Sequence, residues 1–600
     1  MLRAPLVQSA FAGSQEGLPF EAVEAICRAL KSISVQSLIR SRYTFAILSG
    51  LILASAFPNV GIAGFAWLAP ALILASALGT DGRKSFRIGY VAGFAHYLAS
   101  LYWLLCIPVR GFPILGWIAL SAFLALFPAS WTWLCTKYIS RSYPLAEQTD
   151  STSLRAALIN WAGQPWFQRF GTALLCAALW VGLEMIIARI FGGFPWNLLG
   201  ASQYRMIPLI QIASFTGVYG VSFMLVWMAI SVLNAIAAIV RAPQDRHGWL
   251  RDVAVPMLVV SLLIAFGLHR IRNVPNSDRS LNVALIQPSI PQTMIWDQTE
   301  DMVRFNALLQ LSEQALTNKT DLLIWPEAAI PRLLRYDREI FEAVSNLARS
   351  NRVWMIVGAD DADPREGATR REDVEYYNAS FLISPDGKLA RRYRKRSLVM
   401  FGEYIPLERW LPFIKWFTPV TGSFTPGTKA VPFEITSTDE TDAEAIPSTN
   451  TIAKTSVLIC FEDNFPHLVR EYVEPDTDFL VNITNNGWFG ESAAQWQHAA
   501  NAIFRAIETG TPLIRCSNNG LTCWVDSAGR VREIFRDEKD TIYGPGFLTI
   551  SVPLLESGKS RASTFYLRHG DWFGWSCLGL VILKSFVHLK RKSLPRHPVR

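Results

Sequence analysis

Charged side chains, cysteines and clustered basic residues are all scarce in this sequence. Asp, Glu, Lys and Arg together make up 18% of its 600 residues, against about 25% in an average soluble protein, which excludes a wholly soluble enzyme and a disordered chain. The net charge of +8 is spread along the chain, so it does not predict a basic face that would bind nucleic acid. The eight scattered cysteines predict neither a disulfide framework nor a zinc pattern, and we expect no metal ion. These absences indicate a membrane protein with a polar domain attached.

Long apolar runs fill much of the chain, and half of all residues are hydrophobic. A run of roughly 18–25 apolar residues can cross a hydrocarbon core about 30 Å thick. The candidate spans are residues 43–60, 63–78, 88–109, 115–135, 172–190, 212–240, 253–268 and 572–589. The first two runs are short and are separated by Pro58 and Gly61, so they form either a tight hairpin of two spans or one re-entrant pair. The sequence therefore predicts about eight spans.

Lys and Arg residues in the short loops predict the orientation of these spans. Basic residues precede the first span and follow the last, and others lie between spans two and three, four and five, and six and seven. With eight spans, all of these segments lie on one side, the cytoplasm, and the chain between spans seven and eight lies outside. We therefore expect a cytoplasmic tail (1–42), a seven-span membrane domain (43–270), an external domain (271–568) and a last span with a basic tail (569–600).

Short apolar runs alternate with helical patterns in the external segment. The runs typical of buried strands lie at 282–287, 322–325, 354–358, 455–459, 479–484 and 513–516. The helical patterns lie at 299–317, 339–350 and 495–509. The pair Asp386-Gly387 predicts a hairpin, and the alternation as a whole is typical of an α/β layered fold. Two acidic stretches, 360–375 and 436–451, are predicted to be solvated loops.

Three side chains of different chemistry follow predicted strands. Glu327 follows the run LLIW, Cys460 follows TSVLI, and Lys395 closes the second strand of the hairpin. Residues just beyond strand ends are held rigidly, and functional side chains often gather there. Taken one at a time, each has an ordinary explanation: Cys460 as a small buried hydrophobe, Lys395 as part of a solvated basic face, and Glu327 as a helix cap.

The three blocks together resemble a known family. LLIWPEAAIP, KRSLVMFGEYIP and VLICFEDNFP resemble the Glu, Lys and Cys blocks of the nitrilase superfamily, in the same chain order. GGFPWNLLG, GVYGVSF, IPQTMIW, NNGWFG and PLIRCSNNG are similar to segments of the apolipoprotein N-acyltransferases of Gram-negative bacteria, and so is the plan of seven spans, an external domain and one last span. The resemblance covers about residues 45–590. It departs from the family's usual pattern at Ser397, Met400 and Phe461, where His, Pro and an aromatic hydroxyl are usual.

The resemblance implies both a fold and an activity. The external domain would be a periplasmic α-β-β-α nitrilase-like sandwich, held at the inner membrane. Cys460 would attack an acyl ester of a membrane phospholipid, typically phosphatidylethanolamine, and the resulting thioester would acylate the amine of the diacylglyceryl cysteine of an apolipoprotein. Glu327 would serve as general base, while Lys395 and the backbone N–H of Phe461 would stabilise the oxyanion. The resemblance implies neither a metal nor a diffusible cofactor.

Further polar and loop residues carry over to the same site. Glu403 and Glu462 match acidic positions beside the triad, although each could instead hydrogen-bond its own loop. Gly193 and Trp196 lie in a loop that should face the exterior and border the site. The aromatic residues that could flank the acyl-chain entry, or could instead anchor the protein at the membrane interface, are Trp296, Trp488 and Phe489.

Some ionisable residues outside these motifs are predicted to be structural. Glu184 lies within a predicted span, where a charge is a functional candidate, but pairing with Arg189 is the simpler interpretation. Structural salt bridging is also expected for three residues of one helix, which are His498, Arg505 and Glu508.

Two other classes of protein remain as alternatives. A membrane-tethered nitrilase-like amidase would use the same three side chains on a soluble substrate. A transport or scaffold protein would use the external domain for binding alone and would tolerate replacement of Cys460. The cysteines Cys516 and Cys523 could pair outside the cytoplasm or remain free thiols.

Overall fold

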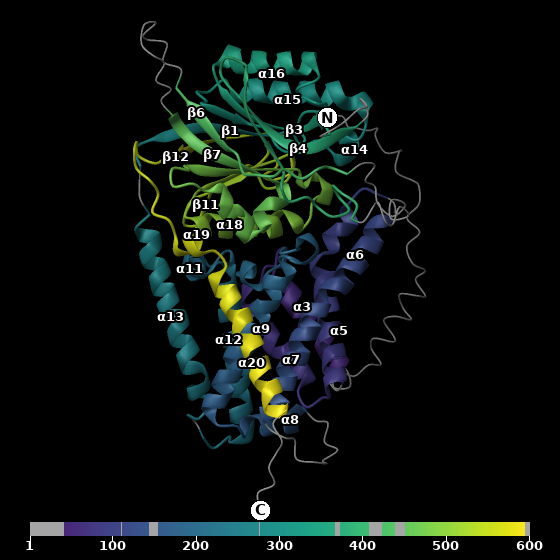
Figure 1. Cartoon of the computed structure of the whole chain (residues 1–600), viewed down its shortest axis with the longest axis vertical. Coiled ribbons are helices and arrows are strands. Elements are labelled where there is room, and N and C mark those ends of the chain that lie inside the picture. Colours follow the sequence, from purple (N-terminus) through teal and green to yellow (C-terminus); the bar gives the residue numbers. More distant parts are fainter. Residues whose placement is uncertain are drawn as a thin grey trace, which may run out of the picture.

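The computed structural model describes residues 41–109, 111–142, 154–245, 247–274, 277–365, 373–406, 423–437 and 451–593. The predicted tail at 1–42 and the predicted loop at 436–451 lie almost wholly outside these residues. A bundle of helices forms one end of the molecule, and a stack of two sheets forms the other (Figure 1).

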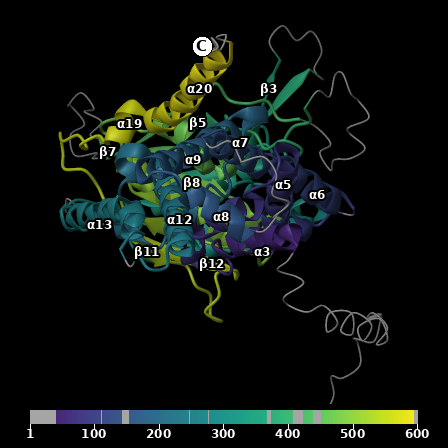
Figure 2. The ribbon, with the colours of Figure 1, turned by 90° about the horizontal axis from the view of Figure 1, so that it is seen from below.

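Apolar helices make up the bundle, as the sequence predicts. Within the described residues, four helical stretches are long and apolar enough to cross a membrane, namely Pro113–Ile139, which runs through two consecutive helices, Trp166–Ile187, Val218–Arg241 and Leu250–Arg272. Four of the eight predicted spans coincide with these stretches, and the other four coincide with shorter or more polar helical segments. The helices of the bundle are α3 (Arg42–Ser55), α4 (Ala69–Ala77), α5 (Gly82–Ser100), α6 (Phe112–Leu124), α7 (Leu126–Ser142), α8 (Leu154–Ala162), α9 (Trp166–Ile187), α10 (Ile207–Ile210), α11 (Ala213–Thr216), α12 (Val218–Arg241), α13 (Leu250–Arg272) and α20 (Trp572–Ser593). Seen from below, α13 and α6 lie at opposite edges, with α8, α9 and α12 between them (Figure 2).

The second predicted span is not one helix. Residues 63–78 form a 3₁₀ turn, η1 (Ala63–Trp67), followed by the nine-residue helix α4. At 1.5 Å per residue α4 is about 14 Å long, which is too short to cross the hydrocarbon core. All but one of its residues are buried, so its apolar character reflects packing inside the bundle rather than contact with lipid. The alternative of a full span at 63–78 is therefore wrong, whereas the re-entrant pair, the other alternative, is not contradicted.

Two six-stranded sheets form the other half of the molecule. Their strand orders are β12-β1-β2-β3-β4-β5 and β11-β10-β9-β8-β7-β6. The strands are β1 (Ser280–Gln287), β2 (Leu322–Ile324), β3 (Trp354–Pro364), β4 (Val374–Ile383), β5 (Leu389–Arg394), β6 (Pro432–Thr436), β7 (Thr451–Ile459), β8 (Phe479–Thr484), β9 (Leu513–Ser517), β10 (Cys523–Val525), β11 (Val531–Ile534) and β12 (Gly546–Pro553). Strands β1, β2 and β3 are parallel neighbours, as are β7, β8 and β9. The ends of these strands therefore gather along the same edge of each sheet.

The sheets are stacked between helices, which confirms the predicted α-β-β-α sandwich. Along β1, Val283 and Leu285 pack in the core shared with the second sheet, whereas Ala284 and Ile286 pack on the outer side. The outer side is covered by α15 (Asp301–Ala315) and α16 (Arg338–Asn351). The opposite face of the stack carries α18 (Ala494–Thr509), which lies between the second sheet and the helical bundle (Figure 1).

The acidic stretch at 360–375 is ordered at both ends rather than forming a solvated loop. Strands β3 and β4 remain paired out to Pro364 and Val374. The side chain of Asp361 is buried and forms ion pairs with Arg335 and Arg394. The acidic composition of this stretch predicts an exposed loop, because the arginines that pair with Asp361 come from other segments of the chain. Residues 366–372 lie outside the described residues.

Candidate active site

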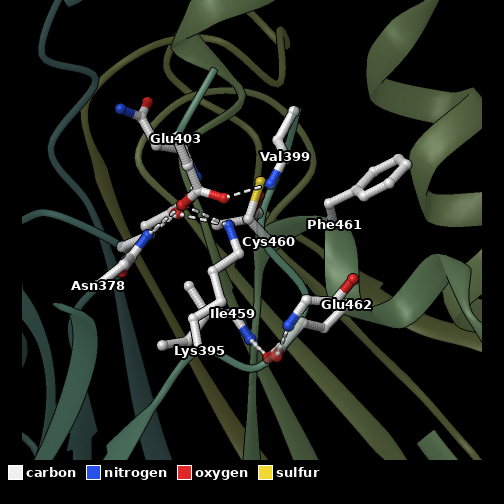
Figure 3. A network of polar contacts seen from close by, with 12 residues as sticks. Asn378, Lys395, Val399, Glu403, Ile459, Cys460, Phe461 and Glu462 are labelled. Carbon is white, nitrogen blue, oxygen red and sulfur yellow. Dashed lines mark hydrogen bonds and ion pairs between the residues drawn. The ribbon is translucent and has the colours of Figure 1, made fainter. Parts of the chain in front are cut away.

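Glu327, Lys395 and Cys460 converge from the ends of three strands. Glu327 lies three residues beyond β2, Lys395 directly follows β5, and Cys460 directly follows β7 at the start of the 3₁₀ helix η7 (Cys460–Asn464). Cys460 has a φ of +52°, which is uncommon for a residue with a Cβ and is found at strained functional turns. Lys395 and Cys460 lie together in the site (Figure 3). Residues far apart in the sequence thus meet in one place.

A buried ammonium lies between two carboxylates at the centre of the site. The Nζ of Lys395 is 2.9 Å from Oε1 of Glu403 and 3.4 Å from Oε1 of Glu327. Asn378, in β4, donates its Nδ2 to both carboxylates, at 2.8 Å to Glu327 and 2.9 Å to Glu403. The second oxygen of Glu327 accepts the backbone N–H of Asn485 at 2.9 Å. These contacts hold Glu327 in one orientation, with both oxygens engaged.

The carboxylates of the site favour the charged form of Lys395 and the neutral form of Cys460. Burial disfavours the charged form of Lys395, but the carboxylates of Glu403 and Glu327 outweigh it and hold the pKa of the ammonium above its ordinary value. Burial raises the pKa of the Cys460 thiol to about 12. This value includes the effect of the Glu327 carboxylate, which also raises the thiol's pKa, and that of Lys395, which lowers it. The resting site therefore holds a neutral thiol beside a charged ammonium.

Two residues near these carboxylates are not identified as site residues by the sequence. Asn378 lies in the middle of an apolar strand, and Asp360 lies in the stretch predicted to be a loop. Burial raises the pKa of Asp360 to about 7, and the carboxylates of Glu327 and Glu403 act in the same direction. The pairing of β3 with β4 places Asp360 directly opposite Asn378. Only the strand register brings the two residues to the site.

Glu462 joins the loop after Lys395 to the turn of Cys460. Its side chain is fully buried and accepts the backbone N–H groups of Arg396 at 2.7 Å, Ser397 at 3.2 Å and Ile459 at 2.8 Å. The hydroxyl of Tyr393 also donates to it at 2.7 Å. Glu462 therefore hydrogen-bonds both the loop after Lys395 and the strand end before Cys460, which is the loop-bonding role that the sequence also allowed.

Replacement of Glu462 by glutamine is expected to destabilise the protein by about 1–3 kcal/mol, because an amide NH₂ would face backbone donors in a buried position. The measurement is thermal unfolding in detergent. The matched control is Glu471→Gln, which removes an ion pair between Arg396 and a half-exposed carboxylate and should change stability by less than about 1 kcal/mol. Equal unfolding temperatures for the two variants would contradict this role for Glu462.

An aromatic cluster connects the turn of Cys460 to the helical bundle. Phe461 stacks on Trp196 with ring centroids 5.9 Å apart and an interplanar angle of 18°. Trp196 also contacts Phe489 at 6.2 Å. We call the set to which these rings belong the junction cluster, and its buried members are Leu101, Trp103, Leu124, Ile187, Trp196, Phe461, Phe465, Ala493 and Ala494. Cys460 itself packs against this cluster, so the site borders the ends of the apolar helices.

The loop that contains Trp196 can approach the site only because it contains a glycine. Gly193 has a φ of +82°, and a Cβ at this position would lie 2.3 Å from the carbonyl oxygen of Ala188 and 2.9 Å from the ring of Phe465. The structure therefore brings Gly193, Trp196, Phe461 and Phe489 to one place. Trp296 and Trp488 instead form a separate pair with centroids 5.2 Å apart.

The predicted pairing of Glu184 with Arg189 is wrong. Glu184 accepts the N–H groups of Leu199 at 2.7 Å and Trp180 at 3.0 Å. Arg189 instead pairs with Asp571, at the start of the last helix. Sequence proximity suggested the wrong partner, because the chain returns to the bundle almost 400 residues later.

The structural salt bridging predicted for α18 is confirmed for one pair. Arg505 and Glu508 are 2.7 Å apart, and His498 contacts Asp463 at 2.8 Å. Cys516 and Cys523 are both free thiols, so the alternative of a disulfide between them is wrong. Within the described residues, no group of three or more His, Cys, Asp and Glu side chains is arranged to hold a metal ion.

Comparisons with known proteins match both halves of the chain. The carbon-nitrogen hydrolase family model matches residues 282–544, and the apolipoprotein N-acyltransferase N-terminal domain matches residues 49–231. The apolipoprotein N-acyltransferase of Geobacter metallireducens is 34% identical over 575 residues, which cover 94% of this chain and 99% of that protein. Those of Rickettsia prowazekii and Vibrio vulnificus are 29% and 28% identical, over 81% and 89% of this chain and 87% and 94% of their own lengths. The chain therefore belongs to the apolipoprotein N-acyltransferase family.

Proposed function

We propose that this protein transfers an acyl chain from a membrane phospholipid to the N-terminal amine of the diacylglyceryl cysteine of an apolipoprotein. The observation that carries the proposal is the position of the half-buried Cys460, which lies beside the network of Glu327 and Lys395 and packs against the junction cluster. Similarity over nearly the whole length of a named N-acyltransferase supports the same conclusion.

The first half of the reaction forms a thioester on Cys460. The sulfur attacks the ester carbonyl of the phospholipid while Glu327 takes the thiol proton, a general-base role worth about 10²–10⁴ in rate. The oxyanion of the tetrahedral intermediate is stabilised by the ammonium of Lys395 and the backbone N–H of Phe461. The intermediate collapses as the C–O bond breaks, Glu327 returns the proton to the leaving alkoxide, and a lysophospholipid departs.

The second half transfers the acyl group to the amine. The N-terminal amine of the apolipoprotein attacks the thioester carbonyl, and Glu327 takes a proton from the nitrogen. The C–S bond then breaks, the proton passes to the sulfur, and an amide and the free thiol result. The apolar surroundings of Cys460 keep water from the thioester between the two halves.

The membrane setting explains why one site can collect both substrates. Donor and acceptor are both anchored in lipid, and the junction cluster places the site next to the helix ends. In this proposal the donor is phosphatidylethanolamine, and the protein lies in the inner membrane with residues 271–568 in the periplasm. The segment 1–42 and the basic tail that ends the segment 569–600, after its last span, face the cytoplasm, on the side favoured by their Lys and Arg residues.

The proposed resting state predicts how the reactivity of Cys460 depends on pH. Because the pKa of the thiol is raised to about 12, the thiolate fraction should grow about tenfold per pH unit from pH 7 to pH 10. The rate of alkylation of Cys460 by iodoacetamide, followed by mass spectrometry of its peptide, should rise with the same slope. An ordinary cysteine with a pKa of about 8.5 would level off near pH 9. A plateau below pH 9 for Cys460 would contradict the neutral-thiol state.

The test of the function is transfer by the purified full-length protein in nanodiscs. The substrates are phosphatidylethanolamine with a labelled acyl chain and a synthetic peptide that begins with diacylglyceryl cysteine. We expect N-acylated peptide and lysophospholipid in equal amounts. Hydrolysis of a soluble amide, with no label on the peptide, would instead support the membrane-tethered amidase.

A further inference from the structure

The carbonyl group of Cys460 is held by two side chains that the proposed mechanism does not use. Nδ2 of Asn482, in β8, donates to this oxygen at 3.0 Å. Nε2 of His498, in α18, lies 3.3 Å from the same oxygen. Asn482 and His498 are both fully buried, so these contacts are shielded from competition with water.

The carbonyl of Cys460 and the N–H of Phe461 belong to one peptide group. A peptide unit is planar and trans, so its C=O and N–H point in opposite directions. Side chains that anchor the oxygen on one side therefore set the direction of the N–H on the other. In the proposed mechanism this N–H is one of the two donors to the oxyanion.

His498 is itself held in one orientation by buried partners. Nε2 faces two acceptors, Cys460 O at 3.3 Å and Oδ1 of Asp463 at 2.8 Å, which requires a proton on this nitrogen. Asp463 is in turn paired with the buried guanidinium of Arg515. Nδ1 lies 3.1 Å from the side-chain oxygen Oδ1 of Asn486. The ring can therefore act as a fixed donor rather than as a mobile base.

The same imidazole contacts the loop from the helical bundle. The rings of His498 and Trp196 have centroids 5.1 Å apart and an interplanar angle of 35°. The neighbouring residue Gln497 accepts the indole N–H of Trp196 at 2.8 Å and donates to the carbonyl of Ser100 at 3.1 Å. Through these contacts, α18 connects the peptide group that follows the nucleophile to the helical bundle.

We propose that His498 and Asn482 are positioning residues that direct the N–H of Phe461 toward the oxyanion of the acylation step. This inference rests on the proposed function, because it assigns the two side chains a part in ester attack by Cys460. Neither residue touches the substrate in this proposal, and both act through the peptide group between Cys460 and Phe461.

Two reactions of the same sulfur separate this role from a general structural one. Attack on a phospholipid ester passes through an oxyanion, whereas alkylation by iodoacetamide displaces iodide from carbon and forms none. Loss of an oxyanion donor typically lowers rates by about 10²–10³-fold, and a misdirected donor should cost part of that. Loss of this positioning should therefore slow acylation and leave alkylation by iodoacetamide unchanged.

The variants are His498→Ala, His498→Gln and Asn482→Ala in the full-length protein in nanodiscs, with His247→Ala, an exposed histidine between α12 and α13, as control. Acylation of Cys460 from labelled phosphatidylethanolamine should fall about 10–100-fold in both alanine variants. Alkylation should stay within about threefold of the wild-type rate. Glutamine carries an amide nitrogen close to the position of Nε2, so His498→Gln should restore acylation to within about fivefold. The control should match the wild type in both reactions.

Three results would overturn the inference: wild-type acylation by His498→Ala, an equal fall in acylation and alkylation, or no recovery with glutamine. Because His498 is buried, thermal unfolding of each variant is followed in parallel, and Asn482→Ala and His498→Gln provide the comparison if His498→Ala does not fold. A wild-type protein that forms no acyl group on Cys460 would instead overturn the proposed function, and the inference with it.

Discussion

Replacing Cys460 with serine is expected to abolish acyl transfer, lowering its rate by at least about 10⁴-fold. The serine hydroxyl is a far weaker acid than a thiol, so Glu327 cannot activate it as attack begins. The fold should persist, because the change replaces one small, half-buried atom by another. The measurement is N-acylation of the diacylglyceryl peptide by the variant in nanodiscs.

The matched control for this experiment is Cys106→Ser, because Cys106 is the more exposed thiol. Transfer by this variant should stay within about twofold of the wild-type rate, since this thiol is exposed and exposed substitutions usually have small effects. A Cys460→Ser protein that retained a tenth or more of the activity would mean that the acyl group does not pass through this residue.

Replacing Lys395 with methionine should impair both activity and stability. The ammonium is almost fully buried and lies between the carboxylates of Glu403 and Glu327. Without it, two buried carboxylates face each other and share the amide of Asn378, and removing one partner of a buried pair costs about 3–5 kcal/mol. Loss of an oxyanion donor should also lower the rate by about 10²–10³-fold. Thermal unfolding and the transfer assay measure the two effects separately.

Lys388→Met is the control for the loss of a lysine charge. Lys388 lies at the tip of the β4–β5 hairpin, and its side chain is 81% exposed and paired with the exposed Asp386. Its removal should change stability by less than about 1 kcal/mol and leave transfer unaltered. If Lys395→Met were as stable and as active as this control, the ammonium would have no part in the site.

The local features of the catalytic half were readable from the sequence. The apolar runs before Glu327 and Cys460 are the strands β2 and β7, and Asp386-Gly387 forms the turn between β4 and β5, with Gly387 at a φ of +76°. Each of these features depends on residues adjacent in the chain. The order of the Glu, Lys and Cys blocks then identified the family from short segments.

What the sequence did not reveal depends on contacts between distant segments. Asn378 looks like an ordinary strand residue until the register of β3 and β4 places it opposite Asp360. Nothing in the sequence around Glu184 predicts its hydrogen bond to the N–H of Leu199, and nothing around Arg189 predicts its ion pair with Asp571.

The apolar run at 63–78 shows the same limit in the membrane half. Its composition is that of a spanning segment, but the helix α4 has only nine residues and is buried by neighbouring helices. Hydropathy measures which side chains avoid water and does not distinguish lipid from protein as the apolar partner. Helix length and burial, which only the fold determines, make that distinction.

The most direct test of the account is the mass of the peptide that contains Cys460. The wild-type protein is incubated in nanodiscs with phosphatidylethanolamine of one acyl composition, without acceptor, and then digested. We predict that one acyl chain is attached to Cys460, is removed by neutral hydroxylamine, and disappears when the diacylglyceryl peptide is added as that peptide becomes N-acylated. An unmodified Cys460 throughout, while the peptide still becomes acylated, would contradict the account.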